Sequence, residues 1–288
     1  MVRHRLIPAL ACFLASSNAI WAAERAAFTP DVVYGHKAGM ALTFDVFPPK
    51  ENGNGAGVLF MVSGGWYSVW RPAAEMQPFV QPLTDAGFTV FTVRHGSSPQ
   101  FSIPEIVDDV RRSVRYIRAN AARFGVDPER LGVYGMSAGG HLSLVLGTMS
   151  DKGDPSATDP ILKIANEVQA VVAFVAPTDL RIMVWDCPNH LPAYEKFPAL
   201  NLSIDEAEKY SPLVHVTPDD APTLLIVGRK DTLVPMSHSQ DIHSAFKEQN
   251  VRSDLVVFDE SDHGLRPADM KTAVAAMVDW FRKHLEKR

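Results

Sequence analysis

The segment Gly135-Met136-Ser137-Ala138-Gly139 places a serine between two glycines, directly after a short apolar run and directly before a helical one. A tight turn from a strand into a helix needs glycines beside the serine, because its backbone is strained and neighbouring side chains would collide. Such a turn lifts the serine hydroxyl out of the sheet at a helix N-terminus. The segment predicts that Ser137 is a nucleophile and that the Ala138 amide faces the oxyanion formed when Ser137 attacks a carbonyl.

A serine hydroxyl needs a base and an orienting acid before it becomes a good nucleophile at neutral pH. When the serine lies in a strand-to-helix turn of this kind, the acid and then the histidine follow along the chain, each just past a strand end. Asp231 follows the apolar run 223–227, and His263 follows the run 255–258. We therefore expect His263 to be the general base and Asp231 to be the acid that orients it. Asp179, which also follows an apolar run, is the alternative acid.

Two further side chains are expected to be structural. His141 lies one helical turn after Ser137, where it should point into packing, and Cys187 is not expected to be a nucleophile beside the stronger Ser137 arrangement. Histidine, cysteine and carboxylate side chains do not cluster at metal-ligand spacing. The predicted chemistry therefore needs neither a metal nor another cofactor.

A second oxyanion donor is expected from the loop Val62-Ser63-Gly64-Gly65-Trp66, which follows the apolar run 58–62. Paired glycines let backbone amides approach a ligand closely. We expect Gly64 and Gly65 to line an oxyanion hole together with Ala138. The amide of Trp66 is an alternative donor.

Short β-branched runs alternate with longer stretches of helical period from about residue 56 onward. Buried strands are expected at 58–62, 89–93, 131–134, 168–175, 223–227 and 255–258. Helices are expected at 73–86, 103–124, 138–149, 237–249 and 268–285. The alternation predicts an α/β fold whose mostly parallel sheet is covered by helices on both faces. Segments 31–34 and 41–47 predict an antiparallel hairpin at the N-terminal side.

The regular alternation lapses between residues 181 and 220, where prolines and aromatic residues occur without a clear period. Long irregular segments in α/β enzymes usually lie above the site, so this stretch is a candidate lid or substrate-recognition insertion. No linker divides the remainder. We expect residues 23–288 to form one domain.

Residues 1–22 have the pattern of an export signal: basic residues, the apolar run 6–14, and small residues at a cleavage site near Ala22. The run is shorter than a membrane-spanning helix requires, and no later segment is apolar enough to insert. Attachment of a lipid at Cys12 is an alternative. We expect an exported protein, periplasmic or secreted, whose mature form has no intramolecular disulfide because Cys187 is then its only cysteine.

The composition excludes some classes of partner. The 288 residues are 46% hydrophobic and 21% charged, which suits a globular protein with a sizeable core. The formal net charge is −5, and lysine and arginine do not form a stripe that could follow a phosphate backbone. Nucleic acid is therefore not expected as a partner, and the expected chemistry of Ser137 calls instead for a small-molecule substrate with a carbonyl group that the serine can attack.

From about residue 58 onward the chain resembles the hormone-sensitive-lipase-like and bacterial feruloyl- or acetyl-xylan-esterase-like carboxylesterases of the α/β-hydrolase superfamily. The resemblance is strongest in Ser137-Ala138-Gly139-Gly140-His141-Leu142 and Asp231-Thr232-Leu233-Val234-Pro235. These enzymes carry a histidine and three glycines in the oxyanion loop, often followed by tryptophan. Aligned on Trp66, this chain has Val62 and Ser63 in place of the histidine and the first glycine. The departure raises the question of what supports the loop.

The resemblance implies an α/β-hydrolase fold with an N-terminal antiparallel hairpin and a short lid-like insertion. It also implies a serine carboxylesterase acting on small esters, with acetyl or feruloyl esters of carbohydrates as candidate substrates. A pairing of Arg94 with Asp109 would serve as scaffolding in the stretch before Ser137. An aromatic floor for a sugar or aryl group is a hypothesis for four residues: Trp66, Tyr67, Trp70 and Trp185.

Two other functions remain open. A peptidase or amidase of the prolyl-oligopeptidase type would use the same three residues, but the 288 residues leave no room for the large N-terminal propeller of those enzymes. A non-catalytic binding protein on a hydrolase scaffold is less expected because Ser137, Asp231 and His263 are all in place.

Overall fold

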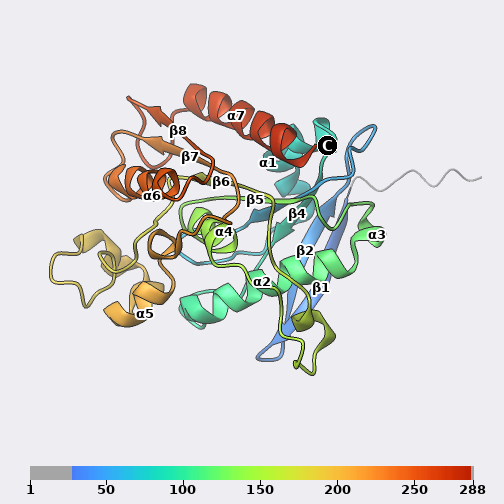
Figure 1. The fold of residues 1–288 in the computed structure, drawn as a ribbon, viewed down its shortest axis with the longest axis horizontal. Helices are drawn as coiled ribbons and strands as arrows, with labels where there is room; N and C mark the ends of the chain where they lie inside the picture. The colour runs from blue at the N-terminus through green and yellow to red at the C-terminus, as the bar shows by residue number, and fades with distance from the viewer. Residues whose placement is uncertain (1–27, 287–288) are drawn as a thin grey trace, which may run out of the picture.

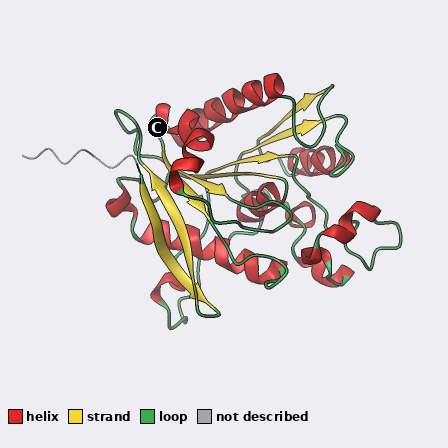
Figure 2. Cartoon of the chain, turned by 180° about the vertical axis from the view of Figure 1, so that it is seen from behind, coloured by secondary structure: helices red, strands yellow, loops and turns green. Residues whose placement is uncertain are grey.

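A mixed β-sheet crosses the middle of the molecule, and helices cover both of its faces (Figures 1 and 2). The computed structural model describes residues 28–286. Within them the sheet has eight strands in the order β1-β2-β4-β3-β5-β6-β7-β8. The strands are β1 (Thr29–Lys37), β2 (Met40–Phe47), β3 (Gly57–Met61), β4 (Thr89–Val93), β5 (Leu131–Met136), β6 (Ala170–Phe174), β7 (Thr223–Gly228) and β8 (Ser253–Phe258). Strands β3 to β8 run parallel, which confirms the expected α/β architecture.

The N-terminal hairpin is also confirmed. Strands β1 and β2 are antiparallel to each other, and β2 is antiparallel to β4. The turn between β1 and β2 contains Gly39 at φ +77°, a conformation that glycine adopts without steric cost. Gly35 lies inside β1, where the pairing register shifts, and does not end the strand as the sequence suggested. The hairpin forms the long ribbon at one edge of the sheet in Figure 2.

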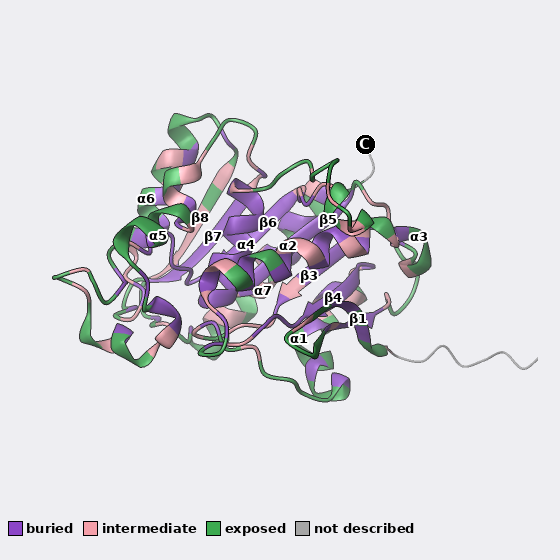
Figure 3. Cartoon of the chain, turned by 90° about the horizontal axis from the view of Figure 1, so that it is seen from below, coloured by how far each residue is buried: buried purple, intermediate pink, exposed green. Residues whose placement is uncertain are grey.

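Seven α-helices pack around the described sheet. They are α1 (Ala73–Asp85), α2 (Ile103–Ala119), α3 (Ala121–Phe124), α4 (Ala138–Thr148), α5 (Ile204–Lys209), α6 (Ser237–Glu248) and α7 (Pro267–Leu285). The apolar sides of α2, α4 and α6 share one hydrophobic cluster with the hairpin, whereas α1 and α7 share a second cluster on the opposite face. Strands β3 to β7 are almost entirely buried between the two clusters, whereas the edge strand β8 is only partly buried (Figure 3). No helix among the described residues is both long and apolar enough to cross a membrane.

The predicted helix 103–124 is two helices. The first, α2, begins after Ser102, whose backbone amide donates to the Glu105 carboxylate at 3.0 Å and so caps the helix. It ends at Asn120, which leaves the helical conformation at φ −112° and donates its side-chain amide to the Tyr116 carbonyl at 2.8 Å. Asparagine competes for backbone acceptors in this way, so the periodic apolar pattern alone did not reveal the break.

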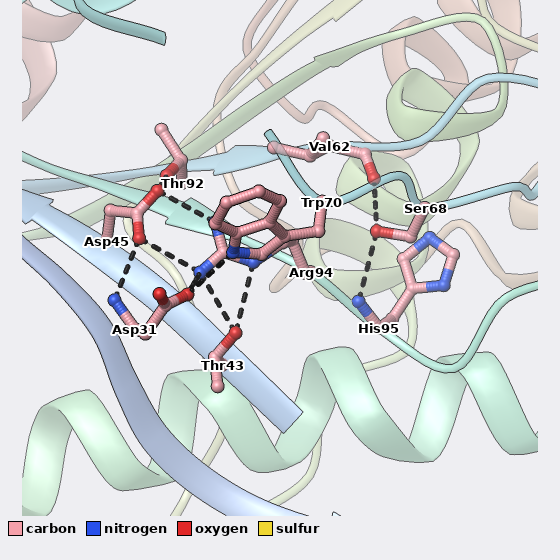
Figure 4. A network of polar contacts seen from close by, with 9 residues as sticks. All are labelled: Asp31, Thr43, Asp45, Val62, Ser68, Trp70, Thr92, Arg94 and His95. Atoms are coloured by element: carbon pink, nitrogen blue, oxygen red, sulfur yellow. Dashed lines mark hydrogen bonds and ion pairs between the residues drawn. The ribbon is translucent and has the colours of Figure 1, made fainter. Parts of the chain in front are cut away.

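Arg94 pairs with aspartates of the hairpin, and the expected pairing with Asp109 is wrong. Its guanidinium lies 2.7 Å from the Asp45 carboxylate and 2.8 Å from the Asp31 carboxylate (Figure 4). Arg94 directly follows β4, whose neighbour is β2, so its side chain meets Asp45 across the sheet. Asp109 instead binds Lys37 at 2.7 Å. Arg94 is still placed to act as scaffolding, but its ion pairs connect the end of β4 to the hairpin and not to α2.

The segment 181–220 contains short 3-10 turns and α5 and no strand of the sheet. It is the gold region beside α5 in Figure 1. Its apolar side chains Met183, Val184, Tyr194 and Leu200 are buried in the same cluster as α4. Its part in substrate recognition stays a prediction, as does the domain boundary at residue 23. The predicted export signal and Cys12 lie outside the described residues.

Candidate active site

Ser137 lies in the turn between β5 and α4. Its backbone has φ +56° and ψ −121°, a region that residues other than glycine rarely occupy and that concentrates at functional sites. Two hydrogen bonds hold it there: the Ser137 amide donates to the Phe174 carbonyl at 2.8 Å, and the His141 amide donates to the Ser137 carbonyl at 2.9 Å. The strained turn is thus fixed by the neighbouring strand and by its own helix.

The flanking glycines are required by close backbone contacts. A Cβ atom on Gly135 would lie 2.3 Å from the carbonyl carbon of Gly139, and one on Gly139 would lie 2.5 Å from the Met61 carbonyl oxygen. No side chain fits at either distance. The glycines therefore let α4 begin immediately over the ends of β3 and β5.

Ser137, His263 and Asp231 form a continuous hydrogen-bonded row. The Ser137 hydroxyl lies 2.9 Å from His263 Nε2, and His263 Nδ1 lies 2.7 Å from Asp231 Oδ2. The other carboxylate oxygen of Asp231 accepts the backbone amides of Leu233 and Val234 at 2.9 and 2.8 Å. The Asp231 side chain is fully buried, so this carboxylate is held in one orientation facing the imidazole.

Asp179, the alternative acid, does not join this row. Its two oxygens accept the Arg181 guanidinium at 2.9 and 2.8 Å. Burial by itself would raise the pKa of the Asp179 carboxyl, but the hydrogen bonds and charge of Arg181 outweigh it and lower the pKa. Asp179 is thus committed to an ion pair at the end of β6.

The loop after β3 leaves the amides of two residues that line the site without a partner in the described part of the chain, and Gly64 is not one of them. The Gly64 amide donates to the Tyr67 carbonyl at 3.0 Å, and the Tyr67 amide donates back to Gly64 at 3.0 Å. Gly65 and Trp66, between them, have φ values of +57° and +61°. Among the described residues the amides of Gly65, Trp66 and Ala138 have no hydrogen-bond acceptor. The expectation for Gly64 as a donor therefore needs correction, because its amide is already bonded within the turn.

This loop has Val62 and Ser63 where the carboxylesterases that it resembles have a histidine and a glycine. Hydrogen bonds from Ser68 and from the segment after β4 support it instead. The Ser68 hydroxyl donates to the Val62 carbonyl at 2.7 Å and accepts the His95 amide at 3.2 Å (Figure 4). The Ser98 amide donates to the Trp66 carbonyl at 3.1 Å. Ser68 and His95 were not singled out from the sequence, because a residue that supports a loop in this way has no distinctive pattern.

His141 is fully buried and contacts the same loop. The Trp66 indole nitrogen donates to His141 Nδ1 at 3.3 Å, and His141 Nε2 lies 2.8 Å from the Tyr210 carbonyl oxygen. Burial lowers the pKa of His141 to about 4, so its imidazole is neutral near pH 7. The expectation that His141 stays out of the proton-transfer row agrees with this geometry, but the sequence did not reveal its bond to Trp66.

A small pocket opens beside the Ser137 hydroxyl, with a cavity volume of about 10 Å³, which is roughly the space that one water molecule needs. Its lining is largely apolar: Gly65, Trp66, Ser137, Pro177, Met183, Tyr194, Phe197, Leu233 and Val234. Three of these residues come from the segment 181–220, and the Phe197 ring lies so close to Gly65 that a Cβ there would be 2.6 Å from it. The sequence placed this segment near the site but did not identify the residues that reach it.

Of the four residues in the hypothetical aromatic floor, Trp66 alone lines this pocket. Trp70 is 58% exposed and donates its indole nitrogen to Asp31 in the hairpin at 3.0 Å (Figure 4). Trp185 donates to the Tyr194 carbonyl at 3.2 Å. Within residues 28–286, no three His, Cys, Asp or Glu side chains are grouped closely enough to hold a metal ion.

The sheet order and the strand-to-helix turn at Ser137 are those of the α/β-hydrolase fold. A truncated carbohydrate esterase from gut microbiota superposes with a TM-score of 0.77 at 25% identity, covering 91% of this chain and 97% of that one. An esterase from Thermogutta terrifontis superposes with a TM-score of 0.71 at 21% identity, covering 88% and 91%. The second similarity shows the fold alone.

The BD-FAE family model matches residues 44–246, and the chain belongs to this family. Among curated relatives, a probable carboxylic ester hydrolase, LipM of Mycobacterium tuberculosis, is 27% identical over 73% of this chain and 49% of its own length. An acetylxylan esterase of Xylanibacter ruminicola is 29% identical over 81% of this chain and 44% of its own. The chain thus spans about half the length of the curated relatives it matches.

Proposed function

We propose that this protein is a serine carboxylesterase that hydrolyses small carboxylic esters through an acyl-enzyme on Ser137. The observation that carries the proposal is the row from Asp231 through His263 to Ser137, with contacts of 2.7 and 2.9 Å, beside backbone amides that have no other acceptor. Nucleophile, base, orienting acid and oxyanion donors are the parts that acyl transfer requires.

The mechanism follows from the direction of these contacts. Asp231 accepts a hydrogen bond from Nδ1–H of His263, which leaves Nε2 unprotonated and able to take the Ser137 hydroxyl proton as the oxygen attacks the ester carbonyl. The amides of Gly65, Trp66 and Ala138 stabilise the oxyanion. His263 then gives its proton to the departing alcohol, leaving an ester on Ser137. Water, deprotonated by His263, releases the acid and restores the serine.

The pocket beside Ser137 supports a short acyl group. Met183, Tyr194 and Phe197 close it with apolar surface, and so narrow a pocket favours an acetyl group over the much larger feruloyl group. The acetylxylan esterase and the carbohydrate esterase among the similar proteins support acetyl esters of carbohydrates as the natural substrates. We therefore propose, more specifically, that the enzyme hydrolyses acetyl esters rather than feruloyl esters.

Amide hydrolysis is the second candidate function. An acylamino-acid-releasing enzyme of Arabidopsis thaliana is 26% identical over 82% of this chain and 31% of its own length. The same three residues could cleave an amide if the leaving amine were accommodated. Binding without catalysis has less support, because it would give no role to a strained serine that is hydrogen-bonded to His263 and, through it, to the buried Asp231.

Export remains part of the proposal and has a direct test. The basic and apolar residues before Ala22 support cleavage of a signal, which would leave a mature N-terminus close to Ala23. Expression of the full chain in a Gram-negative host, followed by N-terminal sequencing of the periplasmic fraction, should find that end. An intact residue 1 on protein retained in the cytoplasm would contradict export.

The activity is tested with nitrophenyl esters of increasing acyl length, acetylated xylo-oligosaccharide, methyl ferulate and aminoacyl anilides. We expect turnover of the acetyl esters, little of methyl ferulate and none of the anilides. A phosphonate ester should add its mass to the peptide that contains Ser137, and Ser137→Ala should remove both labelling and hydrolysis. Retained hydrolysis in Ser137→Ala would refute the mechanism.

A further inference from the structure

His141 connects three parts of the molecule that meet at the site. Its backbone belongs to α4, one turn after Ser137, and its Nδ1 accepts the Trp66 indole hydrogen at 3.3 Å. Its Nε2 lies 2.8 Å from the carbonyl of Tyr210, which directly follows α5 in the segment 181–220. The imidazole is completely buried, so water cannot replace either contact.

The two contacts fix the tautomer of His141. An indole nitrogen can only donate a hydrogen bond, so His141 Nδ1 must be the unprotonated, accepting nitrogen. The proton is then on Nε2, which donates to the Tyr210 carbonyl. Burial keeps the imidazole neutral near pH 7, as its pKa of about 4 requires. Each ring nitrogen therefore has one partner and one role.

Trp66 needs a restraint of this kind. Its backbone has φ +61°, which is unfavourable for a residue with a large side chain, and its amide is one of those beside the pocket that have no acceptor among the described residues. The Trp66 side chain is 2% exposed and stands edge-on to His141, with ring centroids 5.6 Å apart. A side chain held at this end limits how far the Trp66 and Gly65 amides can move relative to Ser137.

We propose that His141 is a positioning residue, which holds the Trp66 and Gly65 amides at the oxyanion through its bond to the Trp66 indole. The bond to Tyr210 attaches the segment 181–220 to the same imidazole. This inference rests on the proposed esterase function, in which those amides stabilise the oxyanion. His141 touches neither the substrate nor the reacting atoms.

Two isosteric substitutions separate the bonds of His141. In His141→Asn the side-chain oxygen takes the place of Nδ1 and can still accept the Trp66 indole hydrogen. In His141→Gln the terminal nitrogen takes the place of Nε2 and can still donate to Tyr210, but the acceptor for Trp66 is lost. Trp66→Phe removes the indole donor and keeps an aromatic ring. Trp280→Phe, at a buried tryptophan of α7 on the opposite face, is the matched control.

The measurements are kcat and KM on nitrophenyl acetate, inhibition by a trifluoromethyl ketone, and the thermal midpoint of unfolding. His141→Gln and Trp66→Phe should lower kcat roughly 10- to 100-fold and weaken the ketone in parallel, because displaced amides lose transition-state stabilisation. KM should stay within about threefold. His141→Asn and Trp280→Phe should keep kcat within about threefold of the unmodified protein. The double variant that combines His141→Gln with Trp66→Phe should have about the same kcat as the slower of the two single variants, because both substitutions remove the same hydrogen bond.

The proposal is overturned if His141→Gln lowers the thermal midpoint while kcat and ketone inhibition stay unchanged, since His141 would then be purely structural. Losses in kcat that multiply in the double variant would also overturn it. Failure of the underlying function has a different signature: the unmodified protein would lack esterase activity, or Ser137→Ala would retain it. The two failures are therefore distinguishable in one set of assays.

Discussion

Replacing Asp231 with asparagine tests the hydrogen-bonded row at its most constrained point. One carboxylate oxygen accepts the Leu233 and Val234 amides, and the other faces His263 Nδ1 at 2.7 Å. An asparagine must keep its oxygen toward the Leu233 and Val234 amides, because its NH₂ group there would face two N–H donors and no acceptor. Its NH₂ group then faces His263 Nδ1. Asp231→Asn should therefore force the imidazole into the tautomer that carries the proton on Nε2.

A histidine with its proton on Nε2 cannot accept the Ser137 proton, so the loss falls on kcat. The equivalent change in a Ser-His-Asp row lowers kcat by about 10⁴-fold, which is about 5 kcal/mol of barrier at ~1.36 kcal/mol per tenfold. The fold should be kept, since asparagine has nearly the same volume and retains both amide bonds. We expect a loss of about 10³- to 10⁴-fold in kcat with a cooperative thermal transition.

Nitrophenyl acetate hydrolysis at pH 7.5 measures this loss, with Asp179→Asn as the matched control. Asp179 is also a strand-end aspartate, but it pairs with Arg181 at 2.8 Å and not with the histidine. Asp179→Asn should keep kcat within about threefold even where it costs stability. A loss below tenfold in Asp231→Asn, or an equally large loss in Asp179→Asn, would refute the assignment of the acid.

Three other substitutions have expected outcomes. Phe197→Ala should enlarge the pocket beside Ser137 and raise kcat/KM for the octanoate ester relative to the acetate ester by at least about tenfold, since each buried methylene contributes about 0.8 kcal/mol. An unchanged dependence of kcat/KM on acyl length would show that the acyl group binds outside this pocket. Asp45→Ala should lower the free energy of unfolding in urea by about 3 kcal/mol, because it leaves the buried Arg94 guanidinium without its shortest ion pair. A loss under about 1 kcal/mol, on the order of a surface ion pair, would show that Asp31 alone is enough to pair with Arg94. Burial raises the pKa of Asp220 to about 6, so the folded state disfavours its charged form and stability is lost as pH rises from about 4 through 6. Asp220→Asn should therefore gain about 1 kcal/mol at pH 7.5, allowing for partial solvent screening, and nothing at pH 4, as followed by urea unfolding at both pH values.

The sequence by itself determined the features that depend on local backbone and on chain order. The glycines beside Ser137 have one geometric reason, the approach of α4 to β3 and β5, and that requirement is visible in five consecutive residues. Asp231 and His263 were located because strand ends of a parallel sheet gather at one edge, so their order along the chain implied their proximity. The strand runs were equally local, since β-branched stretches of this length have few alternatives.

The tertiary structure alone decided which polar groups were left free and which were already bonded. Gly64 and Gly65 are identical in type, and only the reciprocal bonds between Gly64 and Tyr67 show that the first amide is occupied. Arg94 had several aspartates within reach in principle, and strand pairing selected Asp45 over Asp109. Such choices depend on contacts between residues far apart in the chain. A local pattern can name the donors and acceptors, but it cannot say which of them remain for the substrate.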